Sequence, residues 1–191
     1  MKRLLSNETV TLRALEPTDL DTLYRWENDT TLWAVSDTVA PYSREALWHY
    51  LQEYTGDIYA QRQLRLMVTL TRDGSPVGTV DFFNFDPLNN RAEMGLFIAA
   101  EHRGKGLGRQ ALDLLTAYAR DHIGLRQLYV FIGLDNEACL DLFASYGYRQ
   151  VGVLQSWVKR GRDYHDVALL QATCNCVGMS WSLFYKTFSG F

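Results

Sequence analysis

Hydrophobic and polar positions in the first part of the chain follow two different periods. Residues 9–15 alternate between apolar and polar side chains, a pattern typical of a strand with one buried face. From Pro17 to Asn28 the apolar positions recur at helical spacing, and proline suits a first helical turn because its missing N–H needs no partner there. Ser43 is a candidate N-cap for a second helix through Tyr54.

Three strands are predicted in the middle of the chain. Residues 64–71 and 76–85 flank the segment 72–75, Arg-Asp-Gly-Ser, which indicates a hairpin turn. Residues 91–99 form a further strand. Its two faces carry Met94, Leu96 and Ile98 on one side and Glu93, Gly95 and Phe97 on the other.

The second half alternates between helices and strands. A helix to about residue 122 follows a glycine-rich turn, residues 128–132 predict a strand, and residues 136–145 predict a helix. Residues 148–158 and 164–171 indicate a hairpin. This order of elements predicts an α+β (mixed α/β) fold, with one sheet and helices on both of its faces.

Composition narrows the class of protein. The 191 residues suit one domain, and a net charge of -3 argues against a nucleic-acid binder with a broad basic face. Neither the three cysteines nor the four histidines have metal-ligand spacing, so we expect no metal. We also expect a cytoplasmic protein without a membrane partner, because the first residues lack a signal peptide's apolar run and no stretch approaches ~20 apolar residues.

The sharpest local signal is the glycine-rich turn between the strand at 91–99 and the next helix. Its glycines permit positive φ, and unpaired N–H groups at the helix start favour an anion such as a pyrophosphate. The spacing is neither that of a Walker loop nor that of a Rossmann fingerprint. A basic turn that merely connects two elements is the alternative. The segment consists of Arg103, Gly104, Lys105, Gly106, Leu107, Gly108 and Arg109.

These residues resemble a known family. Arg103, Gly106 and Gly108 match the R/Q-x-x-G-x-G/A signature of the GNAT superfamily, and residues 92–98 resemble that family's fourth strand. Downstream, residues 136–148 resemble its N-x-x-[AS]…LY…GF segment. Residues 12–29 resemble the subgroup of ribosomal-protein and polyamine acetyltransferases, so the resemblance spans roughly residues 8–172.

The resemblance implies an acetyl-CoA-dependent N-acetyltransferase. It implies a mostly antiparallel, twisted sheet of six to seven strands with a splayed fourth strand, in a domain covering residues 1–172. The backbones of Phe97 and Ile98 would contact the cofactor, residues 103–109 would cradle its pyrophosphate, and Asn136 and Phe143 would contact its arm. Asn136 is also a plausible helix cap, and it can serve both purposes.

Two catalytic groups are expected by the same reasoning. An alkylammonium, with a pKa near 10, must lose a proton before it attacks the thioester. Glu93 is the first candidate base, with a solvated or salt-bridged strand residue as the alternative. The family often has a tyrosine acid where this chain has Phe143, which cannot donate a proton. Tyr146 or water can take that role, although core packing is the alternative for Tyr146.

The acceptor pocket is less readable. The resemblance implies that the two N-terminal helices wall this pocket, so the candidate wall residues are Trp26, Trp33, Tyr42 and Trp48. Further acidic candidates for the base, any of which can instead bind a cationic acceptor, are Glu27, Asp29, Asp37 and Asp81. Aromatic residues at such spacing often belong to a core instead. We expect a polyamine or another small cationic amine as acceptor, or alternatively a protein N-terminus. A non-catalytic acyl-CoA-binding module and a protein-interaction domain are the competing functions.

Residues 173–191 form an apolar extension beyond the resemblance. They include Trp181, Leu183, Phe184, Phe188 and Phe191. Such a segment can dock on its own domain or on a second subunit, which makes a homodimer an expectation. An extension without any role is equally consistent with the sequence.

Overall fold

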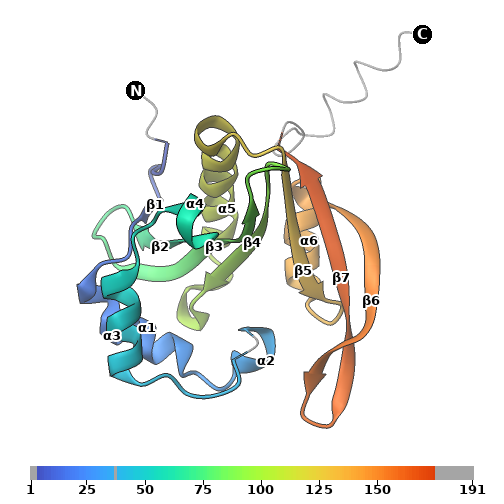
Figure 1. The fold of residues 1–191 in the computed structure, drawn as a ribbon, viewed down its shortest axis with the longest axis horizontal. Coiled ribbons are helices and arrows are strands. Elements are labelled where there is room, and N and C mark those ends of the chain that lie inside the picture. The colour runs from blue at the N-terminus through green and yellow to red at the C-terminus, as the bar shows by residue number, and fades with distance from the viewer. Residues whose placement is uncertain (1–3, 37, 175–191) are drawn as a thin grey trace.

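The computed structural model of the protein describes residues 4–36 and 38–174. Seven strands form one sheet in the order β1-β2-β3-β4-β5-β7-β6 (Figure 1). Their bounds are β1 Val10–Arg13, β2 Leu64–Leu70, β3 Pro76–Asp86, β4 Arg91–Ile98, β5 Gln127–Gly133, β6 Arg149–Arg160 and β7 Asp163–Thr173. Every pairing is antiparallel except that of β4 with β5, which is parallel. The predicted α+β fold is confirmed.

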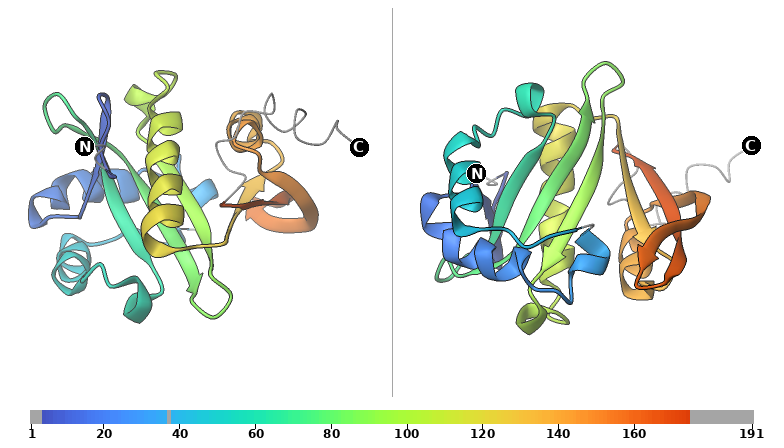
Figure 2. Two further views of the ribbon diagram at one scale, coloured as in Figure 1. Left: turned by 90° about the horizontal axis from the view of Figure 1, so that it is seen from above. Right: turned by 60° about the horizontal axis from the view of Figure 1, so that its bottom comes forward.

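Helices cover both faces of the sheet, as Figure 2 shows. The helical segments are a 3-10 turn Pro17–Asp19, α1 Leu20–Glu27, α2 Trp33–Ser36, α3 Arg44–Glu53, α4 Ile58–Gln61, a second 3-10 turn Ala100–His102, α5 Leu107–Tyr118 with a π-helical turn Ala119–Ile123, and α6 Glu137–Ser145. Ser43 caps α3 as predicted, since its Oγ accepts a hydrogen bond from the Ala46 N–H. The short helices α2 and α4 were not predicted.

Two apolar clusters separate the two faces. The larger cluster joins α5 and α6 to the sheet through side chains such as Leu112, Met94 and Phe143. The smaller one packs α1 and α3 on the other face, where Leu23 and Leu51 meet Met67. The sheet therefore separates an α5/α6 side from an α1/α3 side. An opening between two strands would connect these two environments.

An opening of this kind begins where β4 and β5 stop pairing. Residues 91–93 of β4 pair with residues 127–129 of β5, and the rest of β4 is hydrogen-bonded only to β3 within the described ranges. Beyond that point β5 stays paired with β7 along its whole length. The two halves of the sheet consequently diverge, and β4 is the splayed strand that the sequence predicted.

Candidate active site

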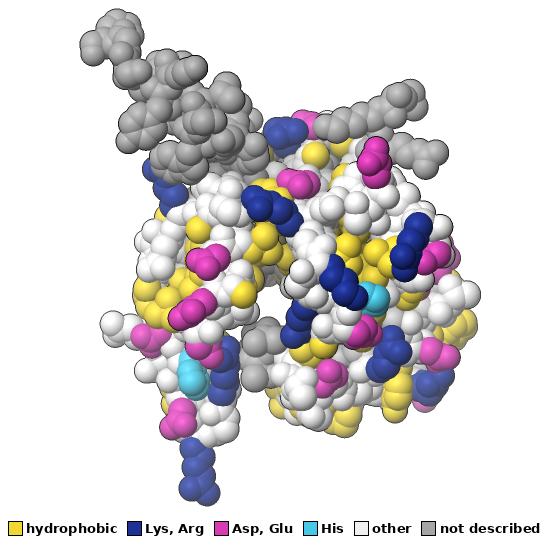
Figure 3. Space-filling model, turned by 180° about the vertical axis from the view of Figure 1, so that it is seen from behind, with side chains coloured by type: hydrophobic (Ala, Val, Ile, Leu, Met, Phe, Trp, Pro, Cys, Tyr) yellow, Lys and Arg dark blue, Asp and Glu magenta, His cyan; other side chains and the backbone are white. Residues whose placement is uncertain are grey.

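A cleft of about 590 Å³ lies between the diverging strands. This volume is typical of small-molecule sites. Residues 93–96 of β4 and 130–133 of β5 line it from opposite sides, together with side chains from both faces of the sheet. Seen from behind, the molecule is hollowed between its two halves (Figure 3). The cleft thus passes through the sheet and has two unlike ends.

The polar end lies on the α1/α3 side and is built from neighbouring strands. The register places Arg65 of β2 opposite Asp81 of β3, and Asp81 opposite Gly95 of β4. Glu93 stands opposite Phe83, two residues further along β3. All five residues line the cleft. Cross-strand pairing therefore gathers one cation and two carboxylates beside the splay.

Asp81 sits in a buried ion-pair cluster. Arg65 Nε donates to Asp81 Oδ1 at 2.6 Å, and Arg65 Nη1 donates to Glu27 Oε1 of α1 at 2.8 Å. The Asp81 side chain is only 5% exposed. Burial raises the pKa of Asp81, and the charge of Arg65 opposes that rise. The three side chains together carry a net negative charge at the edge of the cleft.

Glu93 is held by an unusual neighbour. Asn84 Nδ2 donates to Glu93 Oε2 at 2.8 Å. Asn84 lies where the β3–β4 register slips and has a φ of 46°, a left-handed conformation that asparagine adopts more readily than most residues. The bulge therefore points this amide at the carboxylate, which leaves Glu93 oriented in the cleft lining.

The apolar end lies on the α5/α6 side. Met94 and Leu96 of β4 face Cys139 and Phe143 of α6 across the cleft. Phe143 is 1% exposed and packs edge-on against Tyr148, with the ring centroids 5.0 Å apart. Burial raises the pKa of the Cys139 thiol to about 11, so the thiol is protonated at neutral pH. This end offers surface for an apolar chain rather than charge.

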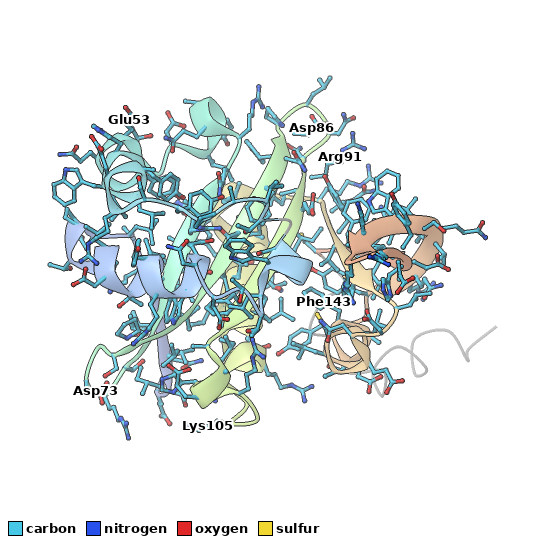
Figure 4. All side chains as sticks on the ribbon, turned by 90° about the horizontal axis from the view of Figure 1, so that it is seen from below. Glu53, Asp73, Asp86, Arg91, Lys105 and Phe143 are labelled. Atoms are coloured by element: carbon cyan, nitrogen blue, oxygen red, sulfur yellow. The ribbon has the colours of Figure 1, made fainter. Side chains whose placement is uncertain are left out.

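The predicted anion cradle has the expected backbone. Gly104 and Gly106 have φ values of +72° and +73°, and a Cβ at either position would meet no atom within 4 Å. Gly106 is the N-cap of α5 and makes no side-chain capping bond, so the first-turn N–H groups receive no cap from a side chain. Figure 4 shows Lys105 at this turn and Phe143 on α6, in the other half of the molecule.

The cations of this turn also stabilise the turn itself. Arg103 Nε donates to the Ile98 carbonyl at 2.9 Å, and Lys105 Nζ donates to the Glu101 carbonyl at 2.7 Å. Leu107 is buried in the core, which anchors the start of α5. The loop is therefore held in an open shape, with its glycine backbone outward and its cationic side chains bonded to the adjoining segment.

Two further predicted residues lie on or beside α6. Asn136 is the N-cap of α6, where its Oδ1 accepts the Cys139 N–H at 3.3 Å, and it also lines the cleft. Tyr146 follows the last turn, and its hydroxyl donates to the Arg109 carbonyl of α5 at 2.8 Å. Burial raises the pKa of Tyr146, and its side chain is absent from the cleft lining within the described residues. The geometry gives no support to Tyr146 as a proton donor.

The candidate acceptor residues separate into two groups. Glu27 and Asp81 belong to the charged cluster around Arg65, and of these two only Asp81 lines the cleft. Trp26 is instead buried behind Phe97, with ring centroids 5.2 Å apart, and Tyr42 is exposed on the loop before α3. Neither Trp26 nor Tyr42 lines the cleft in the described part of the chain.

The remaining candidates lie away from the cleft lining. Asp29 accepts hydrogen bonds from Thr31 in a local turn, Trp33 donates to the Glu27 carbonyl, and Trp48 is exposed on α3. Asp37 and the segment 175–191 lie outside the described residues.

Several cleft residues were missed by the sequence reasoning. They are Arg65, Phe83, Asn84, Trp157 and Arg160. Two of them leave a trace in the sequence. Arg65 interrupts the apolar strand Leu64–Leu70, and Asn84 interrupts the aromatic run Phe82-Phe83-Asn84-Phe85. Arg65 lies in a largely buried strand and therefore needs a partner, whereas Asn84 is exposed; both side chains hydrogen-bond to a carboxylate.

Comparison with known proteins decides the family. The model of the acetyltransferase (GNAT) domain matches residues 9–149. The chain belongs to the GNAT acetyltransferase family. GNAT proteins use acetyl-CoA as the acetyl donor, and the splayed β4 followed by the glycine-rich turn at 103–109 is where the family signature falls in this chain.

Two curated relatives and one solved structure are similar to this chain. A spermidine N(1)-acetyltransferase of Escherichia coli K12 is 28% identical over 152 residues, covering 78% of this chain and 77% of the relative. A putative ribosomal N-acetyltransferase of Bacillus subtilis 168 is 26% identical over 168 residues, covering 84% and 89%. The crystal structure of the Vibrio cholerae spermidine N-acetyltransferase with CoA and spermine superposes with a TM-score of 0.80 at 24% identity, covering 88% and 98%.

Two further features of the described residues concern membranes and metal ions. Among the described residues, no helix has the length and apolar character needed to cross a membrane. In the same ranges, histidine, cysteine and acidic side chains nowhere gather in groups of three or more that could hold a metal ion.

Proposed function

We propose that this GNAT protein transfers the acetyl group of acetyl-CoA to a primary amine of a small cationic acceptor. One observation carries the proposal: the cleft passes through the sheet and joins an apolar end on the α5/α6 side to an acidic end on the α1/α3 side. A thioester arm and an ammonium group prefer opposite environments. Such a cleft can hold both at once, with their reacting atoms meeting at the splay.

The residues at the apolar end fit acetyl-CoA. The open backbone at Gly104 and Gly106 and the start of α5 suit a pyrophosphate, because unpaired N–H groups and the helix dipole favour an anion. Met94, Leu96 and Phe143 offer an apolar channel for the pantetheine arm, and Asn136 offers an amide beside it. When bound, the cosubstrate supplies the activated acetyl group.

The residues at the acidic end fit an ammonium group. Asp81 and Glu93 line the cleft, and Glu27 lies directly behind Arg65. Three carboxylates against one arginine leave a net negative charge that attracts a cation. Polyamines are such cations, and the spermidine acetyltransferase relatives are named for that substrate. We therefore propose a polyamine or a similar small amine as the acceptor.

Glu93 is the proposed base. The ammonium passes a proton to the Glu93 carboxylate, directly or through water, and the neutral nitrogen attacks the acetyl carbonyl. A C–N bond forms, the C–S bond breaks with its electron pair on sulfur, and the amide nitrogen releases its second proton to solvent. Asn84 supports this role because its amide donates to Glu93 Oε2 and orients the carboxylate in the cleft lining.

The leaving thiolate takes its proton from water in this proposal. Phe143 has no proton to donate, and the Tyr146 hydroxyl is bonded to the Arg109 carbonyl. Cys139 is a poor acid here, because its pKa of about 11 lies above the ~8.5 of an ordinary thiol, so transfer from it runs uphill. The cleft is open, which gives water access to the sulfur.

A protein N-terminus is the second candidate acceptor. Arg160 of β6 lines the cleft, and its guanidinium can donate to a peptide carbonyl, a group that polyamines lack. The exposed Trp157 beside it gives an extended acceptor a surface to lie on. Two relatives are named as a putative ribosomal N-acetyltransferase and a ribosomal-protein-serine acetyltransferase, which supports a protein acceptor.

The test measures thiol release from acetyl-CoA with spermidine, spermine, diamines, aminoglycosides and N-terminal peptides. Turnover with a small amine, together with the acetylated amine in a mass spectrum, supports the proposal. Turnover with peptides alone favours the second candidate. Acetyl-CoA binding by calorimetry without turnover on any amine would overturn both candidates and leave an acyl-CoA-binding module.

A further inference from the structure

Arg65 stands at the centre of the acidic end of the cleft. Its guanidinium contacts two carboxylates through two different nitrogens, Nε toward Asp81 and Nη1 toward Glu27. The backbone of Arg65 is held as well, because Tyr54 Oη donates to the Arg65 carbonyl at 3.1 Å and accepts the Arg65 N–H. The residue is thus fixed at its main chain and at its side chain.

The other side of the Asp81 carboxylate faces Gly95 of β4. A Cβ at Gly95 would stand 3.4 Å from Asp81 Oδ2, 3.2 Å from Asp81 Cβ and 2.6 Å from Phe83 Cε2. Gly95 therefore leaves the room that these two side chains occupy. Since Arg65 binds Oδ1, the oxygen Oδ2 is the one turned toward the splayed strand, where the acceptor and the acetyl group would meet.

An arginine in a site for a cation needs an explanation. By charge alone Arg65 repels an ammonium, and a site that only needed negative potential would omit it. Without it, however, Asp81 and Glu27 would be two carboxylates without a cation between them, one of them buried. Burial and like charge would both favour protonation, and the anchor for the ammonium would be lost.

We propose that Arg65 is a positioning residue for acceptor binding: it holds Asp81 and Glu27 on two edges of its guanidinium and fixes the Asp81 carboxylate against Gly95, where that carboxylate anchors the ammonium of the acceptor. The inference rests on the proposed function. It assigns Arg65 no contact with acetyl-CoA, so it predicts an effect on one substrate and not on the other.

Several groups govern the ionisation of Asp81. Arg65 and the Gln63 side chain lower its pKa, whereas burial and Glu27 raise it, and the result is a net rise. The hydroxyls of Tyr50 and Tyr54 also interact electrostatically with Asp81 and Arg65. Activity that needs ionised Asp81 increases with pH through that pKa. Removal of the Arg65 charge therefore moves the acid limb of the pH profile to higher pH.

The chain offers a matched control. Arg13 and Asp19 form another ion pair with a buried acid, with two hydrogen bonds of 2.7 Å and an Asp19 side chain that is also 5% exposed. Neither Arg13 nor Asp19 lines the cleft. A substitution of Arg13 therefore reports the general effect of breaking a buried pair, without a positional effect on the acceptor.

The experiment compares Arg65→Gln, Arg65→Lys and Arg13→Gln with the unmodified chain, using spermidine and acetyl-CoA. For Arg65→Gln we expect the KM of spermidine to rise about tenfold or more, the KM of acetyl-CoA to stay within about twofold, and the acid limb of kcat/KM to move up by about one pH unit. Arg65→Lys should restore the acid limb but not the KM, because one ammonium cannot bridge both carboxylates in the same way. Arg13→Gln should change neither KM value and should leave the acid limb in place.

Calorimetry of spermidine binding in the presence of CoA provides a readout without turnover, and it should reproduce the KM ranking. If Arg65→Gln does not fold, the variants Arg65→Lys and Gly95→Ala test the inference instead. Gly95→Ala should raise the KM of spermidine and leave the KM of acetyl-CoA unchanged. Equal profiles for the Arg65 and Arg13 variants, or a parallel rise in both KM values, overturn the inference and leave the proposed function intact. If the unmodified chain turns over no amine, the proposed function fails and the inference fails with it.

Discussion

The glycine-rich turn beside the apolar end of the cleft is one contiguous run of the chain, whereas the polar end is assembled from strands and a helix far apart in it. Residues 103–109 form this turn, and Gly108 within it lies next to Leu96, which lines the apolar end. At the other end Glu27, Arg65, Asp81 and Glu93 come from α1, β2, β3 and β4. A local loop can be read as a motif. A cluster that depends on strand register becomes visible only when the strands are paired.

The difference also separates two kinds of chemistry. The apolar end works through backbone geometry and packing, so most of its side chains contribute shape. The polar end works through charge, so each carboxylate contributes a specific interaction. Substitutions at the two ends should therefore change different measured quantities. The four predictions below test this difference, in order of decreasing expected effect.

Phe143→Ala should lower the free energy of unfolding by about 3–5 kcal/mol, because removal of a buried aromatic side chain leaves a cavity beside Tyr148. Urea denaturation with linear extrapolation measures the change. Phe131→Ala is the control on β5, since Phe131 is 39% exposed and should lose much less. Similar losses for both variants would mean that the apolar end is not packed as described.

Glu93→Gln should reduce kcat/KM for the amine by about 10²–10³-fold, because glutamine keeps the shape and the Asn84 contact but accepts no proton. Acetyl-CoA binding, measured by calorimetry, should stay unchanged. Glu53→Gln on the exposed end of α3 is the control and should leave both quantities as they were. An active Glu93→Gln variant would shift the role of base to another group.

Gly106→Val should weaken acetyl-CoA binding about tenfold, because a β-branched residue is strained at a φ of +73° and the turn must change shape to relieve that strain. Gly56→Val is a close control, with a φ of +70° and equally open surroundings between α3 and α4. Both variants should lose some stability. An equal loss of acetyl-CoA affinity in the Gly56 variant would contradict the claim that the shape of the turn at Gly106 determines this affinity.

Tyr146→Phe should have the smallest effect, a loss of about 1 kcal/mol in the free energy of unfolding from the missing hydrogen bond to the Arg109 carbonyl. Its kcat should remain within about twofold of the unmodified chain. Initial-rate assays at saturating concentrations of both substrates measure kcat. A tenfold or larger fall in kcat would restore Tyr146 as the proton donor despite its position.

The elements with strong periodicity were predictable from the sequence. The strands around the hairpin at 72–75, the capped helix α3 and the long helix α5 all lie where the pattern placed them. The short helices α2 and α4 were missed, since four residues are too few to show a helical period. The splay of β4 came from the family resemblance, and hydrophobic pattern alone contains no sign of it.

The candidate site was predictable to a similar, uneven degree. The glycine-rich turn was recognised because its residues are contiguous. Asp81 and Glu27 were suspected as acids, but Arg65 between them was not, because its strand pattern gives no register with β3. Helical spacing put Tyr146 near Cys139 and Phe143. The helix ends before Tyr146, however, and the ring turns toward Arg109 of α5.

The most direct test of the account is the initial-rate pattern with both substrates varied. Because the proposed function places the acetyl donor and the amine at the two ends of one cleft at the same time, double-reciprocal plots should intersect, as in a ternary complex. One acetylated amine should form per thiol released. Parallel lines would indicate an acyl-enzyme formed before the amine binds. That result would contradict the claim that the cleft joins both substrates directly.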